Sequence, residues 1–352
     1  MQKKIIALAV AGLVSGVAFA QTNVTVYGAI DMAYMHKSDV ISGKTTNAYN
    51  AFDTNGWDAS WFGLKGTEDL GNGMTASFQA EMGILPDYQN AATQQRPTFV
   101  QLAGQNWGSI KAGNFFIDKV LFNTKGGFAN AGMSEKALRV GMNTWANNAV
   151  MYSSPSWSGF QFNLGYSSNF SFANDDKAAQ ASNTRTWFGD VSYSSGPLFV
   201  GATYSKFGGG GDSSFGGHEW NIGAAYDFKV VNVGLVYNSV SWDNGFDWLT
   251  TRTFVADYDR DTWRLNVGIP FTAKDSVYLS YVYAGTDRNK NGLKDYDQHG
   301  FGIGYKHDMS KRTSVYAQAY FVDADDTMFV NFKQQSGETL QNGFQTGIRH
   351  TF

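Results

Sequence analysis

The sequence contains no cysteine, only 5 prolines and few charged residues among its 352 positions. Without cysteine there is no disulfide scaffold, no Cys-ligated zinc and no thiol nucleophile. Charged residues make up 16% of the chain, compared with about 25% in an average globular protein. The formal charge of −3 provides no basic surface for nucleic acid. We therefore expect neither a disulfide-stabilised domain nor a nucleic-acid partner.

Glycine and aromatic residues are abundant instead, with 40 Gly, 18 Tyr, 27 Phe and 10 Trp. So many aromatic side chains can bury a large area, which excludes a disordered chain. The length allows two domains of ordinary size or one large barrel.

The N-terminus has the pattern of an export signal. Residues 1–20 contain Lys3 and Lys4, then an apolar stretch, then small residues at Ala18 and Ala20. We expect cleavage between Ala20 and Gln21. The alternative, a membrane anchor, is disfavoured because the apolar stretch is shorter than the roughly 18 residues of a spanning helix. Loss of the two lysines lowers the formal charge from −3 to −5.

Alternation of apolar with polar or small residues dominates the rest of the chain. In 159–168, for example, Phe160, Phe162, Leu164 and Tyr166 alternate with polar residues and glycine. Such alternation predicts strands with one apolar face. The predicted strands are 24–36, 59–67, 74–85, 97–104, 108–115, 147–154, 159–168, 184–195, 198–206, 218–228, 231–241, 254–270, 276–285, 299–308, 312–322 and 343–352.

The connections between these strands alternate between short turns and long linkers. The long ones are 37–58, 86–96, 116–146, 169–183, 207–217, 242–253, 286–298 and 323–342. An even number of strands, with short turns at one rim and long loops at the other, is typical of an antiparallel up-and-down membrane barrel. All five prolines fall at strand ends or in connections, where no ladder donor is needed.

A soluble β-sandwich would also alternate, but two features favour the membrane barrel. Tyrosines such as Tyr204 and Tyr226 end the apolar faces of successive strands at opposite rims, which predicts two aromatic belts. The unbroken series of strands also shows no division into two sheets. We therefore predict an all-β, transmembrane 16-stranded barrel over residues 21–352, with a water-filled lumen.

Four ordered motifs give this chain a family resemblance. They are 60–73 (SWFGLKGTEDLGNG), 152–160 (YSSPSWSGF), 310–316 (SKRTSVY) and the ending 347–352 (GIRHTF). With the start VTVYGAID at 24–31 they resemble the trimeric general porins of Gram-negative outer membranes, particularly the betaproteobacterial branch. The resemblance implies a homotrimer in the outer membrane, in contact with lipid and lipopolysaccharide. It also implies passive diffusion of ions and small hydrophilic solutes, with no enzymatic activity and no cofactor.

In that family the terminal aromatic residue, here Phe352, is read by the outer-membrane barrel assembly machinery. The third long loop, here 116–146, folds into the barrel and places charges opposite a ladder of wall arginines. The loop's charged residues are Asp118, Lys119, Lys125, Glu135, Lys136 and Arg139.

The wall of this chain departs from the family pattern. Trp61, Asn114 and Met151 stand where the family commonly has arginine, and Lys65 lies on the same strand face as Trp61. Further basic wall candidates are Arg264, Lys306 and Arg349. We therefore hypothesise weak or cation-leaning selectivity. The alternative is that Trp61 and Met151 only pack beneath the folded loop.

Other motifs are weak. Asp287, Asn289 and Asn291 begin a calcium-loop pattern, but Gln298 stands where a bidentate glutamate is required. We expect no metal site there. No Gly-x-Ser-x-Gly occurs and the five histidines are scattered, so an enzyme built on a barrel is disfavoured. A substrate-specific channel with its own binding site stays an open alternative.

Overall fold

The computed structural model describes residues 24–41, 43–54, 56–87, 94–124, 145–168, 184–209, 216–243, 258–287, 295–324, 329–330, 333–334 and 339–352. Its strands are β1 (Thr25–Ile41), β2 (Lys44–Thr54), β3 (Trp61–Gly71), β4 (Met74–Gly83), β5 (Gln94–Gly104), β6 (Gly108–Phe116), β7 (Trp145–Ser153), β8 (Phe160–Ser167), β9 (Thr184–Ser195), β10 (Leu198–Gly209), β11 (Gly216–Asp227), β12 (Asn232–Asp243), β13 (Tyr258–Pro270), β14 (Asp275–Asp287), β15 (Tyr296–Asp308), β16 (Thr313–Ala324), β17 (Phe329–Val330), β18 (Lys333–Gln334) and β19 (Thr339–Thr351). The helix α2 (Lys119–Asn123) lies in the connection after β6.

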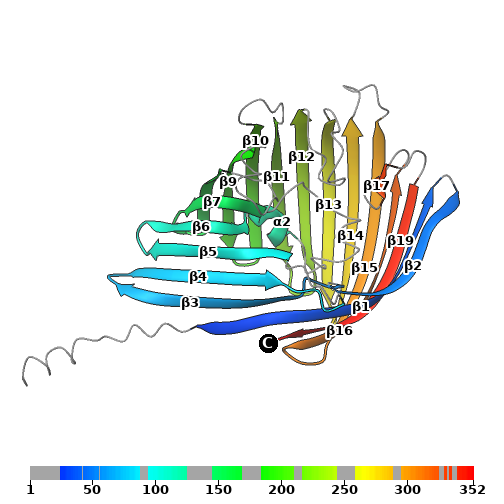
Figure 1. The fold of residues 1–352 in the computed structure, drawn as a ribbon, viewed down its shortest axis with the longest axis horizontal. Helices are drawn as coiled ribbons and strands as arrows, with labels where there is room; N and C mark the ends of the chain where they lie inside the picture. The colour runs from blue at the N-terminus through cyan, green and yellow to red at the C-terminus, as the bar shows by residue number, and fades with distance from the viewer. Residues whose placement is uncertain are drawn as a thin grey trace, which may run out of the picture.

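The large sheet closes on itself. It holds 17 strands, and without β2 the other sixteen form a ring in which each strand is antiparallel to the next. The ring closes between β1 and β19, and Gly28 and Phe352 exchange backbone hydrogen bonds of 3.2 and 3.1 Å at its end. In Figure 1, β3–β6 lie at a large angle to the upright β11–β15, as tilted strands on different walls of a barrel do. Closure confirms the predicted barrel and excludes the two-sheet sandwich.

One predicted linker is largely strand. The sequence predicts a long connection over 37–58, but β1 extends to Ile41 and β2 pairs with its upper half. Met32 pairs with Thr54, while Ala29 pairs with Trp61, so β2 and β3 follow the same edge of β1 with an interruption between them. The prediction fails here because backbone pairing with β1 holds a segment whose own apolar alternation is weak.

The interruption turns residues 56–60 toward the lumen. The backbone N–H groups of Gly56 and Trp57 donate to the Asp31 carboxylate at 3.0 and 3.2 Å. Trp57 packs against Tyr278 and Tyr316, with ring centroids 5.3 and 5.4 Å apart. The inside of the wall at β1, β14 and β16 is therefore lined by this short segment.

The barrel wall has an apolar outside and a polar inside. Outward residues such as Val100, Leu164 and Trp187 are 62%, 60% and 64% exposed, whereas inward Asn221 and Gln345 are each only 2% exposed. A contiguous apolar exterior of this kind is stable against hydrocarbon and not against water. Among the described residues, no helix has the length and apolarity to cross a bilayer.

Aromatic contacts form a row at each rim, as the tyrosine positions predict. At the loop end, Tyr166 contacts Trp187 and Tyr237 contacts Trp263, with centroids 4.6 and 4.7 Å apart. At the turn end, Phe160 contacts Tyr193 with centroids 4.6 Å apart. Amphipathic rings at both ends of an apolar wall match the two interfaces of a membrane.

A substitution at Gly28 tests the contact between β1 and the C-terminal end of β19, which closes the barrel. A Cβ at this position would lie 2.5 Å from the Phe352 ring and 2.6 Å from the Trp61 carbonyl oxygen. We expect Gly28→Val to destabilise the barrel by about 1–3 kcal/mol, the usual cost of overpacking. The measurement is the urea midpoint for loss of the heat-modifiable folded band on gels. Gly208→Val is the control, since a Cβ there meets nothing closer than 3.9 Å. Equal urea midpoints for Gly28→Val and Gly208→Val would contradict a role of the β1–β19 contact in the stability of the barrel.

Candidate pore constriction

The connection after β6 begins inside the barrel. Asp118 caps α2 by accepting a 2.8 Å hydrogen bond from Leu121 N–H, and α2 packs against β10, β11 and β12 (Figure 1). Val120 and Leu121 are buried against this wall. Glycines make the approach possible, because a Cβ at Gly223 would lie 2.8 Å from Val120 and one at Gly234 only 2.1 Å from the Thr124 carbonyl oxygen. The close approach of this connection to the barrel wall is therefore one reason why the sequence is rich in glycine.

Polar wall residues hold the same segment. Asn221 Nδ2 donates to Asp118 Oδ2 at 2.6 Å, and Asn238 Nδ2 donates to Asn221 Oδ1 at 2.8 Å. Arg264 donates to the Leu121 carbonyl at 3.4 Å, which places this predicted wall residue beside the loop. Burial raises the pKa of the Asp118 carboxyl to about 6, and the negative charge of Asp190 adds to the rise.

Trp61 faces the lumen within a cluster that contains an unpredicted arginine. Its ring lies 4.8 Å from that of Tyr27, and the Arg96 guanidinium lies 5.4 Å from the Trp61 ring. Arg96 pairs with Glu81 at 3.0 Å, and Tyr27 donates to the same carboxylate at 3.0 Å. Lys65 Nζ lies 4.6 Å from the Tyr27 ring centroid, so Lys65 and Trp61 contact the same ring.

Sequence reasoning missed Arg96 because it assigned 86–96 to a linker. The strand β5 begins earlier, at Gln94. The pairing of β4 with β5 shifts register between Ala80 and Met82, so the simple alternation is broken opposite Arg96. The Arg96-Pro97 pair is the feature of the sequence that could have indicated the beginning of this strand.

Asn114 and Met151 are structural members of the wall. Asn114 Nδ2 donates to the Arg96 carbonyl at 3.1 Å. Met151 is 8% exposed and belongs to an apolar cluster with Phe115 and Phe188. A second unpredicted cation lies beside them, since Lys111 pairs in register with Met151 and its Nζ lies 4.2 Å from the Phe115 ring.

Arg349 is placed near the inward segment 56–60. It pairs with Asp31 at 3.4 Å and with Asp58 at 3.3 Å, and it donates to the Ala59 carbonyl at 3.1 Å. Lys306 pairs with Asp308 at 3.2 Å near the end of β15. The predicted wall residues therefore belong to separate clusters and not to one ladder.

The remaining predicted positions lie outside the described residues. These are Lys125, Glu135, Lys136 and Arg139 of the loop, Asn289 and Asn291 of the calcium-like motif, and Ala20 and Gln21. Lys119 begins α2 and Asp287 ends β14. Within the described part of the chain, no group of His, Asp and Glu side chains is arranged to hold a metal ion.

Comparison with solved structures places this architecture among porins. An anion-selective porin from Comamonas acidovorans superimposes with a TM-score of 0.74 at 24% identity, over 94% of this chain and all of the other. OmpF of Salmonella typhi gives a TM-score of 0.68 at 15% identity, over 96% of this chain and 99% of that chain. At these identities the likeness establishes the fold.

Sequence comparison goes further. An outer membrane porin protein of Bordetella pertussis is 30% identical, and outer membrane porin protein 32 of Delftia acidovorans is 29% identical, each with both chains fully covered. Residues 7–327 match the family described as Gram-negative porin. The chain therefore belongs to the Gram-negative porin family, and its barrel is an outer-membrane channel for the passive diffusion of ions and small hydrophilic solutes.

Proposed function

We propose that this porin is a weakly charge-selective general diffusion channel, narrowed by the third connection at 116–146. The observation that carries the proposal is the pairing of lumen cations with carboxylates. Arg96 pairs with Glu81, Arg349 with Asp31 and Asp58, and Lys37 with Asp39. A paired cation contributes little net field at the distance of a passing ion.

The other charged side chains on the lumen wall are also of both signs. Among the described residues they include the cations Lys65, Lys111, Arg260 and Arg264 and the acids Asp118, Asp190 and Glu219. Acids and bases adjoin each other, because Asp118 and Arg264 both contact the α2 segment. This mixture favours weak selectivity over the strong preference of a wall with one sign.

Arg96 and Lys111 revise the hypothesis of a cation-leaning pore. Both lie beside positions where arginine is replaced, Arg96 at Trp61 and Lys111 at Met151. Lys111 adds a positive charge that the sequence motifs alone did not predict, whereas the charge of Arg96 is offset by Glu81. The structural neighbour from Comamonas acidovorans is titled anion-selective, and we propose that this chain is less so because of the carboxylates facing its cations.

We also propose a homotrimer, delivered by a cleaved signal at residues 1–20 and assembled through recognition of Phe352. OmpT of Vibrio cholerae, with a TM-score of 0.66, is described in a trimer form. The family to which the chain belongs consists of channels, so we propose no enzymatic activity. Unheated gel samples should migrate as a trimer and heated samples as a monomer. Identical migration before and after heating would contradict the trimer.

The Glu81–Arg96 pair allows a charge-specific test of selectivity. Arg96→Gln leaves Glu81 as a net negative charge and should favour K⁺, while Glu81→Gln should favour Cl⁻. A unit charge about 7 Å from an ion in water is worth about 0.6 kcal/mol, with opposite sign for K⁺ and Cl⁻, so each permeability ratio should change by about sevenfold before screening by salt. The measurement is the reversal potential in a KCl gradient across a planar bilayer.

Lys274→Gln is the matched control for this test, because Lys274 lies in an exposed turn outside the lumen. It removes one cation and should leave the reversal potential at the wild-type value. Shifts of the same sign for Arg96→Gln and Glu81→Gln, or a wild-type channel with strong anion preference, would contradict the proposal.

Asp118 predicts a pH dependence. Its carboxyl has a pKa of about 6, above the ordinary value of 3.8, so it is charged at pH 7.5 and neutral at pH 5. The folded state binds this proton more readily than the unfolded state, so acid does not weaken loop docking through this group. Loss of one lumen charge should shift the reversal potential toward Cl⁻ with a midpoint near pH 6.

The shift should disappear in Asp118→Asn. It should persist in Asp227→Asn, which removes an exposed carboxylate at the turn after β11 that accepts from Lys229 N–H. A pH titration that is the same in wild type and Asp118→Asn would rule out Asp118 as its source.

A further inference from the structure

Two aromatic side chains meet on the inside of the barrel wall. Tyr27 of β1 and Trp61 of β3 contact each other edge to face, with ring centroids 4.8 Å apart and ring planes at 74°. On the outside of the same wall, Phe62 of β3 pairs in register with Met82 of β4, and these side chains are 39% and 48% exposed. Alternation along β3 therefore places the neighbouring Trp61 on the lumen side. This wall lies half-way round the ring of strands from β11, against which α2 packs.

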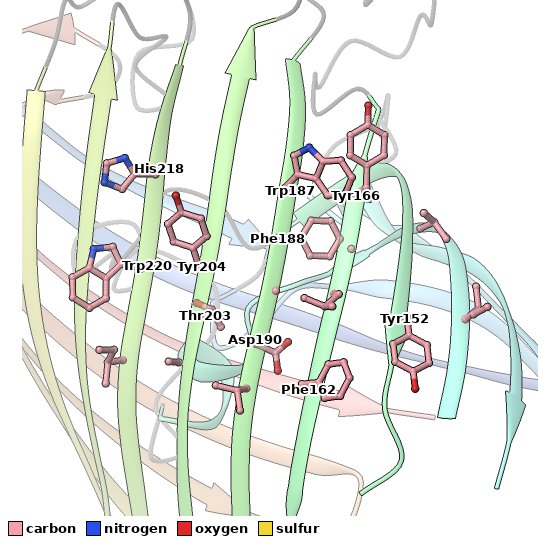
Figure 2. Close-up of a pocket in the computed structure, with 18 residues that line it drawn as sticks. Tyr152, Phe162, Tyr166, Trp187, Phe188, Asp190, Thr203, Tyr204, His218 and Trp220 are labelled. Atoms are coloured by element: carbon pink, nitrogen blue, oxygen red, sulfur yellow. The ribbon is translucent and has the colours of Figure 1, made fainter. Parts of the chain in front are cut away.

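An aromatic ring inside the barrel differs in its surroundings from the aromatic rows of the outer wall. Figure 2 shows part of those rows, with Trp187, Tyr204 and Trp220 on β9, β10 and β11. Trp187 and Tyr204 are 64% and 49% exposed on the outside, where amphipathic rings belong to a membrane interface. Trp61 is half-buried on the lumen side. Its exposed part meets water and passing solutes.

The polar donors around Trp61 converge on one carboxylate. Glu81 Oε1 accepts hydrogen bonds from Tyr27 Oη at 3.0 Å and from Gln79 Nε2 at 2.7 Å. Glu81 Oε2 accepts from Arg96 Nε at 3.1 Å and pairs with a terminal nitrogen of the same guanidinium at 3.0 Å. The charges of Glu81 and Arg96 therefore offset each other. The flat guanidinium, 5.4 Å from the Trp61 ring centroid, extends the planar surface of the indole.

Lys65 is the cation of this cluster that faces no carboxylate. It is exposed, and no ion pair printed for the described residues of the barrel includes it. Its register partner on β4 is the neutral Gln79. Its Nζ lies 4.6 Å from the Tyr27 ring centroid, so Tyr27 contacts both the ammonium group and the Trp61 ring. The wall thus presents an aromatic surface and an unpaired ammonium group side by side.

We propose that Tyr27, Trp61 and Lys65 form a solute-binding subsite for aromatic carboxylates. The solute's ring packs on Trp61, since aromatic pairs favour offset or edge contacts with centroids about 4.5–7 Å apart. Its carboxylate accepts a charge-assisted hydrogen bond from Lys65 Nζ. The subsite rests on the proposed function, because a channel without strong charge preference admits such an anion.

The residues of the subsite also determine which solutes it disfavours. An aliphatic carboxylate interacts with Lys65 but has no ring to pack on Trp61. An aromatic cation packs on Trp61 but is repelled by Lys65. A single exposed ammonium group and one half-buried ring bind weakly, which suits a channel because a conducted solute must leave as readily as it enters.

The probes are 3-phenylpropionate and propionate, added to the purified full-length porin in planar bilayers. The measurement is the solute concentration that gives half of the maximal reduction in KCl current. We expect wild type to bind 3-phenylpropionate about tenfold more tightly than propionate, because only the former buries a ring. This comparison needs no variant, so it does not depend on the folding of an altered barrel.

Variants separate the ring from the charge. Trp61→Leu should weaken binding of 3-phenylpropionate by about fivefold and leave propionate unchanged, whereas Trp61→Phe keeps a ring and should bind like wild type. Lys65→Gln should weaken binding of both solutes by about tenfold, the usual order for loss of a hydrogen bond to a charged group.

Lys111→Gln is the matched control. Lys111 Nζ also lies over an aromatic ring, 4.2 Å from that of Phe115, but Phe115 is only 1% exposed and offers no surface to a solute. The variant removes one lumen cation and should keep the tenfold preference for 3-phenylpropionate. Loss of that preference in Lys111→Gln would overturn the proposal.

Three further results would overturn it. They are equal binding of the two carboxylates by wild type, unaltered binding of 3-phenylpropionate in Trp61→Leu, and binding of phenethylammonium as tight as that of 3-phenylpropionate. The second result would assign Trp61 to packing alone. The KCl reversal potential of the same bilayers without solute tests the proposed function separately. Strong preference for one ion there would contradict weak selectivity, whereas weak selectivity without ring-dependent binding would contradict the subsite alone.

Discussion

The constraint on which this structure depends is the pairing of every backbone N–H and C=O group within the hydrocarbon of a membrane. Water is absent there, so an open sheet edge costs several kcal/mol for each unmatched group. The chain meets this constraint by joining its first and last strands, where Gly28 and Phe352 exchange hydrogen bonds. Closure in turn separates two solvents, which explains why apolar side chains face outward and amides face inward.

The polar inside then determines what the channel does. Glycines at 223 and 234 admit the connection after β6, and Asn221 and Asn266 bind its polar groups. On the facing strands, Tyr27 and Arg96 share the carboxylate of Glu81. A wall built from paired charges provides hydrogen-bonding surface to water and small solutes while limiting the net field that an ion encounters.

Much of the fold could be predicted from the sequence, because alternation in segments such as 159–168 directly records which side chain faces lipid. The strand β2 could not, since its partner β1 and not its own pattern holds it. Period two is the basis on which Lys65 and Arg264 were predicted as wall residues, and these two side chains contact Tyr27 and the Leu121 carbonyl respectively. Arg96 was missed because a register shift opposite it breaks that period. Lys111 lies over Phe115 of its own strand and over Phe99 of the neighbouring strand β5, and the second contact depends on strand pairing.

Neutralisation of lumen cations by specific carboxylates is tested most directly by the double variant Glu81→Gln/Arg96→Gln. Removing both charges of a pair leaves the net charge of the wall unchanged. The reversal potential of the double variant in a KCl gradient is predicted to equal that of wild type. A double variant that retained the full shift of either single variant would show that the other charge does not act on the passing ions, which contradicts neutralisation within the pair.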